Sequence, residues 1–556
     1  MAEVSAKPNF PSAQASRRRR PGRRAMLSAV LALAMTAASA AAAGTAAAGA
    51  AARTAGPASP PGHLVSPLAL GLNTAPWDYT YAANRSAGGG ADVIQPLLKA
   101  AGIGLLHYGG GAYADYYDWQ TNTDIQTCIW GNPFGSFTGA PFPYDTTAPF
   151  TGASCDRTGA LPFDRFASQA KAIGAQSFVT VNYGSGTPAE AAAWVSHAAG
   201  GVALWEVGNE NYGCWEVNNW LAKAPENFQG YKPADTKIVN GHGMYPTCPR
   251  TSQGNTQGMR TLATSYAVNA RSFMVAMKKA DPAVRIGVPW DFPSSVLGAS
   301  VPDNTVWNDT VLGQDSQYVS FVDAHYYPFV FHGATGGGNP SVQQVLQALK
   351  SVPSLYGQIS TALAASDPGA QVVIGETGVS NNMTTIACTP TGALFAAGDV
   401  LSWLAAGAQS VDWWDMNNYS RTSAKCPNPD YAMFSSSSPP VAQTPYYGYL
   451  LASMLAQPNA TLATMSTSDP ADVLAYQSRL PGGREALAFL NTNTSSAKTV
   501  TFSPGTPLSG QLRTWTYSAG NQNPANSKIV QGAATASSVA SGISLPPESL
   551  VILQSS

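Results

Sequence analysis

Two glutamates, Glu210 and Glu376, each stand at the end of a short apolar segment. Glu210 follows Asn209 in Val-Ala-Leu-Trp-Glu-Val-Gly-Asn-Glu-Asn, residues 202–211, and Glu376 closes Val-Val-Ile-Gly-Glu, residues 372–376. A strand made only for packing is expected to end in a turn rather than in acids and amides. A pair of carboxyl groups can perform retaining glycoside hydrolysis, in which one acid protonates the leaving oxygen and the other carboxylate attacks the anomeric carbon.

This chemistry needs a fold that brings the two strand ends together. Short apolar, β-branched segments alternate with segments of helical period. The expected strands cover residues 68–73, 103–108, 177–182, 203–208, 284–289, 319–325, 372–376 and 410–414. The expected helices cover residues 91–101, 162–173, 188–199, 257–280, 342–365, 391–406 and 445–455, and the connection after the fifth strand is poorly defined. This alternation predicts an α/β fold, a (β/α)8 TIM barrel over residues 66–456, with its active site at the carboxyl ends of the strands.

A doubly wound sheet is the alternative architecture. It would favour a glycine-rich phosphate loop after the first strand, and residues 71–78, Gly-Leu-Asn-Thr-Ala-Pro-Trp-Asp, do not form one. After about residue 457 helical periodicity fades, and Ser, Thr and Gly increase. Short alternating segments at 473–477, 486–491, 499–502, 512–517 and 550–553 predict a C-terminal all-β sandwich domain over residues 457–556.

Four segments resemble the family 51 α-L-arabinofuranosidases, which belong to the clan A glycoside hydrolases. They are residues 205–213 (Trp-Glu-Val-Gly-Asn-Glu-Asn-Tyr-Gly), 181–192, 108–119 and 325–327 (His-Tyr-Tyr). The resemblance covers most of the expected barrel, and this family also carries a C-terminal β-sandwich. It implies a retaining enzyme that cleaves terminal sugars, α-L-arabinofuranosides, from polysaccharide by double displacement without a cofactor.

The resemblance also assigns roles to particular residues. Glu210 would be the general acid/base and Glu376 the nucleophile. Asn209 would bind the sugar 2-hydroxyl beside the nucleophile. Tyr327 would donate a hydrogen bond to Glu376 and keep it ionised. Glu206 lies inside the strand and is interpreted as a buried partner of a basic group in the barrel.

Further side chains are expected to bind the sugar. Trp413 and Trp414 alternate across a strand, so only one of them should face the barrel mouth, and Trp413 is the candidate. The further sugar-binding candidates are Asn182, His325, Trp413, Trp77 and Asp78, and Tyr113, Tyr117 and Trp119 are additional candidates for a stacking platform. The other histidines show no ligand spacing, so the sequence predicts no catalytic metal.

The chain departs from the family at several places, including the unusual tryptophan pair Trp413-Trp414 of the eighth strand. His107 stands where the family usually has arginine, Trp77-Asp78 stands where it has a sugar-binding glutamate, and the segment after the seventh strand reads Gly-Glu-Thr-Gly. Another clan A activity therefore stays open: a xylosidase, a glucuronidase or an endo-acting enzyme. A non-catalytic carbohydrate-binding protein is the third hypothesis, although a binding module has no need for the carboxyl pair.

The first forty residues have the composition of an export signal. Several arginines at positions 17–24 precede the apolar residues 26–38, and Ala-Ser-Ala at 38–40 matches a small-residue cleavage pattern. The sequence therefore predicts secretion, by the Sec or the twin-arginine route, followed by an Ala/Gly/Pro-rich linker over residues 41–65. The apolar segment is too short for a comfortable membrane span.

Charge and cysteine content limit the remaining partners. Without the seven basic residues and one acidic residue of 1–40, the chain keeps 23 basic and 30 acidic residues, a net charge of −7. An acidic chain without basic clusters argues against nucleic acid and anionic membranes, which leaves polysaccharide or oligosaccharide as the partner. The six cysteines are even in number and lack metal-binding spacing, so disulfides are expected, with sequential pairing as one of many alternatives.

Overall fold

The computed structural model describes residues 62–82, 90–124, 157–184, 186–213, 216, 237–239, 242–244, 256–292, 305–329, 340–380, 386, 389–417, 432–519 and 529–555. The predicted export signal, nearly all of the predicted linker and all six cysteines lie outside these residues. Within the described ranges, every helix is too short or too polar to cross a lipid bilayer.

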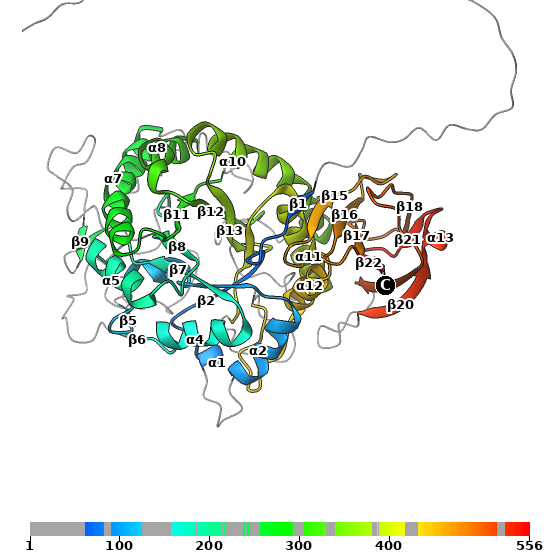
Figure 1. Cartoon of the computed structure of the whole chain (residues 1–556), viewed down its shortest axis with the longest axis horizontal. Coiled ribbons are helices and arrows are strands. Elements are labelled where there is room, and N and C mark those ends of the chain that lie inside the picture. The colour runs from blue at the N-terminus through cyan, green and yellow to red at the C-terminus, as the bar shows by residue number, and fades with distance from the viewer. Residues whose placement is uncertain are drawn as a thin grey trace, which may run out of the picture. The chain divides into compact units, whose positions relative to one another are not determined.

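Eight parallel strands close into a barrel, with helices outside the ring of strands (Figure 1). In chain order they are β2 (Leu70–Thr74), β3 (Leu105–Tyr108), β7 (Gln176–Val181), β8 (Leu204–Val207), β11 (Ile286–Trp290), β12 (Phe321–Tyr326), β13 (Gln371–Thr377) and β14 (Ser410–Trp413). All eight expected strands are confirmed, and β14 pairs with β2 to close the ring. The barrel prediction is therefore confirmed.

The expected helices also form. They are α2 (Gly90–Ala100), α4 (Phe163–Ile173), α5 (Pro188–Ala198), α7 (Thr256–Ala280), α9 (Val342–Ala348), α10 (Val352–Ser366), α11 (Pro390–Ala406) and α12 (Thr444–Ala452). The single helix expected over 342–365 is divided by a 3-10 turn, η5 (Leu349–Ser351), before α10, which has a proline in its first turn. The poorly defined fifth connection contains α8 (Thr305–Asp315), whose buried face includes the polar Asn308 and Asp315.

The remaining short elements lie mostly in loops. They are α1 (Tyr79–Ala82), η2 (Gly111–Tyr116), β4 (Tyr117–Asp118), β5 (Thr123–Asp124), β6 (Arg157–Thr158), β9 (Lys237–Val239), β10 (His242–Met244), η4 (Ser316–Tyr318) and α13 (Ala536–Val539). β4, β5 and β6 form a small sheet, and its first strand follows η2 after β3. η2 and this small sheet extend the connection between β3 and α4.

Side chains inside the barrel change from apolar to polar toward the carboxyl ends of the strands. An apolar floor is formed by Leu68, Leu105, Phe178, Leu204, Phe321 and Val373. Side chains alternate across a strand, so the residue two positions further on also points inward. That next layer contains His107, Thr180, Glu206, Asp323 and Gly375, and its side chains are buried. We call it the polar layer; it lies directly below the strand ends.

The C-terminal region is an antiparallel β domain, as predicted. Its seven-stranded sheet has the order β1 (His63–Leu64), β15 (Thr461–Thr464), β16 (Val473–Arg479), β17 (Glu485–Asn491), β22 (Ser549–Ser555), β19 (Gln511–Ser518) and β20 (Val530–Thr535). A second sheet of β18 (Lys498–Val500) and β21 (Ile543–Leu545) contributes to the domain core. One boundary differs from the sequence prediction: His63 and Leu64 lie within the predicted linker but pair with Leu462 and Thr461.

The two faces of the seven-stranded sheet bury different cores. Along β17, Leu487 and Phe489 join the core beneath β18 and β21, whereas Ala488 and Leu490 join the large core of the barrel. This strict alternation places one face of the sheet against the barrel helices. Hydrogen bonds fix the contact, including one of 2.7 Å between Tyr476 Oη on β16 and Ser402 Oγ on α11.

Candidate active site

The barrel brings Glu210 and Glu376 together at its mouth. One carboxylate oxygen of each glutamate and a ring nitrogen of His325 lie within 4.8 Å of one another. Retaining glycosidases hold their two carboxyl groups about 5–5.5 Å apart, whereas inverting enzymes need roughly 6.5–9.5 Å to admit a water molecule. The geometry therefore suits direct attack by one carboxylate rather than attack by water between the two.

A β-bulge turns Glu376 toward the mouth. Asp323 of β12 pairs with Val373, but two residues later His325 pairs with Glu376, so β13 has one extra residue over this stretch. Without the bulge, simple alternation from the inward-facing Val373 would point Glu376 away from the barrel interior. A bulge beside an active site commonly re-aims a side chain in this way.

Glu210 is reached through two residues with left-handed backbone. Gly208 has a φ of 76°, and a Cβ there would stand 2.1 Å from Asn211 Oδ1, so only glycine fits. Glu210 itself has a φ of 44°, which is uncommon for a residue with a Cβ. Tyr212 donates a hydrogen bond of 3.1 Å to Glu210 Oε1. The chain therefore accepts local strain where it presents this carboxyl group.

His325 lies between the two glutamates. Its Nδ1 is 2.9 Å from Glu210 Oε1 and 3.4 Å from Glu376 Oε2, while its Nε2 is 3.9 Å from Asp323 Oδ2. Burial alone would lower the pKa of His325, but Glu376, Asp323 and Glu210 together outweigh it and raise the pKa well above its ordinary value. The imidazole of His325 therefore lies between two carboxyl groups that favour its charged form.

Glu376 receives the hydrogen bond that the resemblance implied. Tyr327 donates its hydroxyl hydrogen to Glu376 Oε2 at 2.8 Å. Burial nevertheless raises the pKa of Glu376 to about 7, and the opposing effects of His325 and Tyr327 only limit the rise. Tyr327 thus favours the ionised form of Glu376 without keeping it fully ionised at neutral pH.

Removal of the Tyr327 hydroxyl should make Glu376 harder to ionise. We expect Tyr327→Phe to raise the pKa of Glu376, because the hydrogen bond favours its charged form. A nucleophile reacts only when ionised, so the acid limb of the kcat/KM profile should move to higher pH by about 0.5–1 unit. The neighbouring Tyr326→Phe is the control, since its hydroxyl bonds Ala348 O on the helical side. An acid limb that stays in place for Tyr327→Phe would contradict this role.

Asn209 belongs to a second group of buried acids behind Glu210. Its Nδ2 donates to Glu216 Oε1 at 3.1 Å, and its backbone N donates to Asp115 Oδ2 at 3.4 Å. Burial, then the charges of Asp115 and Glu210, raise the pKa of Glu216 well above its usual value. Sequence reasoning missed Asp115 and Glu216; neither closes a strand, and only their spatial convergence on Asn209 reveals them.

Three predicted sugar-binding residues are held by other groups. Asn182 donates from Nδ2 to Tyr117 O at 3.0 Å and accepts from Gly186 N at 3.0 Å, so it joins two loops. Asp78 accepts from Thr74 Oγ1 at 3.1 Å and from Tyr81 N at 2.8 Å, which fixes the first turn of α1. Trp77 is half-buried and packs against the barrel core. A sugar contact by any of the three stays a prediction.

Trp413 is not at the mouth, and this corrects the sequence prediction. Its side chain is fully buried on the helical side, where its ring centroid lies 6.3 Å from that of Phe395 and 6.2 Å from that of Tyr449. Trp414 takes the other side of the strand. A Cβ built on Gly111 would stand 3.0 Å from the Trp414 ring and 3.5 Å from Glu376 Oε1, so this indole lies beside the nucleophile.

The two tryptophans should separate stability from substrate binding. Trp413→Ala is expected to lower the free energy of unfolding by about 3–5 kcal/mol, because it empties a large buried site. Trp414→Ala should destabilise much less, since this side chain is half-buried, but should raise KM for a glycoside. Urea denaturation and steady-state kinetics on the pair measure both effects. Equal stability losses would show that Trp414 is also a core residue.

Two groups in the barrel have the donor types of a metal site. They are Glu210, His325 and Glu376 at the mouth, and His107, Glu206 and Asp323 in the polar layer, each with one donor atom per residue within 4.8 Å of the others. At the mouth, hydrogen bonds from His325 and Tyr327 already join these carboxylates to protein groups. We assign no metal to either group, and the absence of a catalytic metal stays a prediction.

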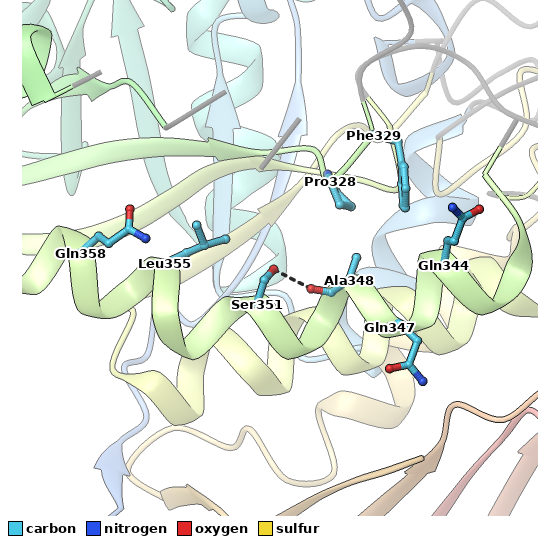
Figure 2. A pocket seen from close by; sticks show the side chains of 8 residues that line it. All are labelled: Pro328, Phe329, Gln344, Gln347, Ala348, Ser351, Leu355 and Gln358. Atoms are coloured by element: carbon cyan, nitrogen blue, oxygen red, sulfur yellow. Dashed lines mark hydrogen bonds between the residues drawn. The ribbon is translucent and has the colours of Figure 1, made fainter. Parts of the chain in front are cut away.

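A pocket of about 450 Å³ has a lining that includes neither of the two glutamates (Figure 2). It is formed by Pro328 and Phe329, which follow β12, and by side chains of α9, η5 and α10. Ser351 Oγ donates to Ala348 O at 2.7 Å along its wall, and three glutamines supply most of its polar lining. Its described lining lacks an acid or a base, so we assign the pocket no catalytic role.

Comparison with known proteins identifies solved structures that share this fold. No protein-family model matches the chain, and no curated protein matches it in sequence. A family 51 arabinofuranosidase from Xanthomonas axonopodis pv. citri is 15% identical at a TM-score of 0.60, over 89% of this chain and 97% of that one. The α-L-arabinofuranosidase of Thermotoga maritima is 15% identical at a TM-score of 0.60, over 90% and 98%.

A structure with a different activity is also similar. The 4-O-α-L-rhamnosyl-β-D-glucuronidase of Fusarium oxysporum is 14% identical at a TM-score of 0.55, over 90% of this chain and 99% of that one. The resemblance noted in the sequence thus has a structural counterpart that spans both the barrel and the β domain. The chain has the fold of the family 51 arabinofuranosidases, a fold that other clan A glycoside hydrolases share.

Proposed function

We propose that the protein is a retaining glycoside hydrolase that removes terminal sugars, chiefly α-L-arabinofuranosyl groups, from polysaccharide or oligosaccharide. One observation carries the proposal: the carboxyl groups of Glu210 and Glu376 approach within 4.8 Å at the carboxyl ends of β8 and β13. The distance suits double displacement. A cofactor is not needed for this chemistry.

The residues divide the reaction into two displacements. In the first, Glu376 attacks the anomeric carbon while Glu210 protonates the leaving oxygen, which gives a glycosyl ester on Glu376. In the second, Glu210 accepts a proton from water, and the water oxygen displaces Glu376 from the sugar. His325 contacts both carboxyl groups, so its imidazole can stabilise whichever of the two carries the negative charge. Trp414 offers an apolar face to the sugar beside Glu376.

The identity of the sugar is the finer part of the proposal. The likeness of this fold to two arabinofuranosidases supports a furanoside. A glucuronidase or xylosidase is the second candidate. The segment Trp77-Asp78 stands where the family has a sugar-binding glutamate, and the Asp78 carboxylate already accepts hydrogen bonds from Thr74 and Tyr81. A glucuronidase structure is also nearly as similar. Nucleic acid and membrane lipid are not proposed as partners. We also propose that the protein is exported, on the basis of residues 1–40.

A panel of 4-nitrophenyl glycosides tests the proposal: the α-L-arabinofuranoside, the β-D-xyloside and the β-D-glucuronide. We expect the arabinofuranoside to be cleaved fastest, and proton NMR to show first a product with the configuration of the substrate. Initial formation of the opposite anomer would contradict retention. Fastest release from the glucuronide would keep the reaction type and select the second candidate. Absence of hydrolysis from the panel and from arabinan and xylan would contradict the enzyme proposal.

A further inference from the structure

Asp323 lies beneath the catalytic pair and contacts both sides of it. It is on β12, two residues before His325, and is only 1% exposed. Its Oδ1 accepts a hydrogen bond of 2.6 Å from the backbone N of Gly375. Its Oδ2 faces His325 Nε2 at 3.9 Å, and in the described part of the chain neither of these two atoms has a hydrogen-bond partner. Each therefore faces the other as its ionic partner.

Gly375, which immediately precedes Glu376, is held from two directions. Its carbonyl oxygen accepts from Asn73 Nδ2 at 2.7 Å and lies 3.2 Å from His107 Nδ1. Its N–H donates to Asp323, and a Cβ at this position would stand 2.1 Å from the Asp323 carboxylate. The bulge that aims Glu376 is thus fixed by side chains of three other strands. Of these side chains, Asp323 is the one that accepts from the bulged N–H.

Burial disfavours the charged forms of the other titratable members of the polar layer. Burial lowers the pKa of His107 to about 4, and burial raises the pKa of Glu206 well above its ordinary value. Thr180 Oγ1 lies 2.8 Å from His107 Nε2 and 3.0 Å from Glu206 Oε2. Thr180 Oγ1 donates its hydrogen to Glu206 Oε2, so this hydroxyl joins His107 and Glu206 across the polar layer. Burial therefore weakens the charge that His107 and Glu206 can present to His325.

We propose that Asp323 is a positioning residue that holds the Gly375 peptide and the His325 imidazole with one carboxylate, and so sets both the aim of Glu376 and the charge between the two glutamates. The inference rests on the proposed function. The groups that face His325 are Glu210 and Glu376 at the mouth, Asp323 below it, and the polar-layer groups Glu206 and His107, with Asp412 of β14 beyond. Asp323 is the carboxylate that pairs with His325 on the side away from the substrate.

Asp323→Asn tests the charge while keeping the shape. The amide oxygen can still accept from Gly375 N, but the negative charge near His325 is lost. A nearby anion stabilises the protonated imidazole, so loss of the Asp323 charge should lower the pKa of His325. The proton shared between Glu210 and His325 should then be released at lower pH. We expect the alkaline limb of kcat/KM to move down by about one pH unit.

Asp412→Asn is the matched control. Asp412 is also fully buried in the barrel, with Oδ2 4.0 Å from His107 Nδ1. Burial raises its pKa well above the usual range and so favours its neutral form, and its ion-pair distance is to His107 rather than to His325. The alkaline limb should stay in place. A purely structural role for Asp323 would lower activity without moving the limb, and that result would overturn the proposal.

Histidine NMR decides the question without activity. In protein labelled at histidine Cε1, with His325→Gln to assign the signal, we expect His325 of the wild type to remain protonated at pH values where free histidine is neutral. Asp323→Asn should titrate at lower pH than wild type. Unchanged titration would overturn the role of Asp323, and so would an ordinary pKa in the wild type, a result that does not depend on the folding of Asp323→Asn. Failure of the glycoside panel would instead reject only the proposed reaction.

Discussion

Glu376→Gln is expected to lower kcat/KM for 4-nitrophenyl α-L-arabinofuranoside by about 10⁴-fold or more. The amide has the shape of the carboxylate and can still accept from Tyr327, but it cannot form the glycosyl ester. Loss of a nucleophile removes the chemical step rather than binding, so kcat should fall far more than KM rises. Steady-state kinetics with a burst-phase measurement would record the loss.

Glu485→Gln is a suitable control for the loss of a buried glutamate, since Glu485 belongs to β17 of the C-terminal β domain. It should retain wild-type kinetics. An activated 2-fluoro glycoside should add one sugar mass to the peptide that contains Glu376 in the wild type and none in Glu376→Gln. If the variant kept activity within tenfold of the wild type, another residue would have to be the nucleophile.

Glu210→Ala should show a loss that depends on the leaving group. An arabino-oligosaccharide needs protonation of its leaving oxygen, so its hydrolysis should fall by about 10²–10⁴-fold. Nitrophenolate leaves with little protonation, so formation of the glycosyl enzyme from the aryl substrate should fall much less. The second displacement still needs a base, and the glycosyl enzyme should therefore accumulate.

Azide distinguishes this role from simple damage. It needs no base and can occupy the space vacated by the Glu210 side chain, so it should restore turnover of the aryl glycoside and give a glycosyl azide of retained configuration. Glu206→Gln is the matched comparison, because Glu206 lies four residues earlier, buried below the mouth. Equal losses for aryl and oligosaccharide substrates in Glu210→Ala would contradict the acid/base assignment.

Much of the barrel could be read from the sequence because its strands are short apolar segments with polar ends. α8 was missed for a physical reason. Its inward face carries Asn308, which holds the backbone of Asp291 through two hydrogen bonds, and Asp315, which accepts from Arg271. Buried polar residues weaken the hydrophobic period from which a helix is inferred. The edge strand β1 was missed because two residues are too few to show an alternation.

The site was predictable where residues close a strand, and not where the backbone departs from regular alternation. Glu210, Glu376, His325 and Tyr327 meet as expected. The prediction that Trp413 rather than Trp414 faces the mouth was wrong. The Asp412 side chain fills the space beside Gly71 inside the barrel, so its neighbour Trp413 must face outward. The bulge in β13 and the convergence of Asp323 on Gly375 depend on pairing between strands, which one strand's sequence does not encode.

The pairing of β1 with β15 has a consequence for how this protein can be divided. The strand that precedes the first barrel strand lies at the edge of the C-terminal sheet, so the barrel sequence is inserted between two neighbours of one sheet. A shortened gene product that begins at β2, or one that stops at residue 456, would leave part of that sheet unpaired. Recombination that exchanges the β domain between enzymes must therefore carry both flanks of the barrel together.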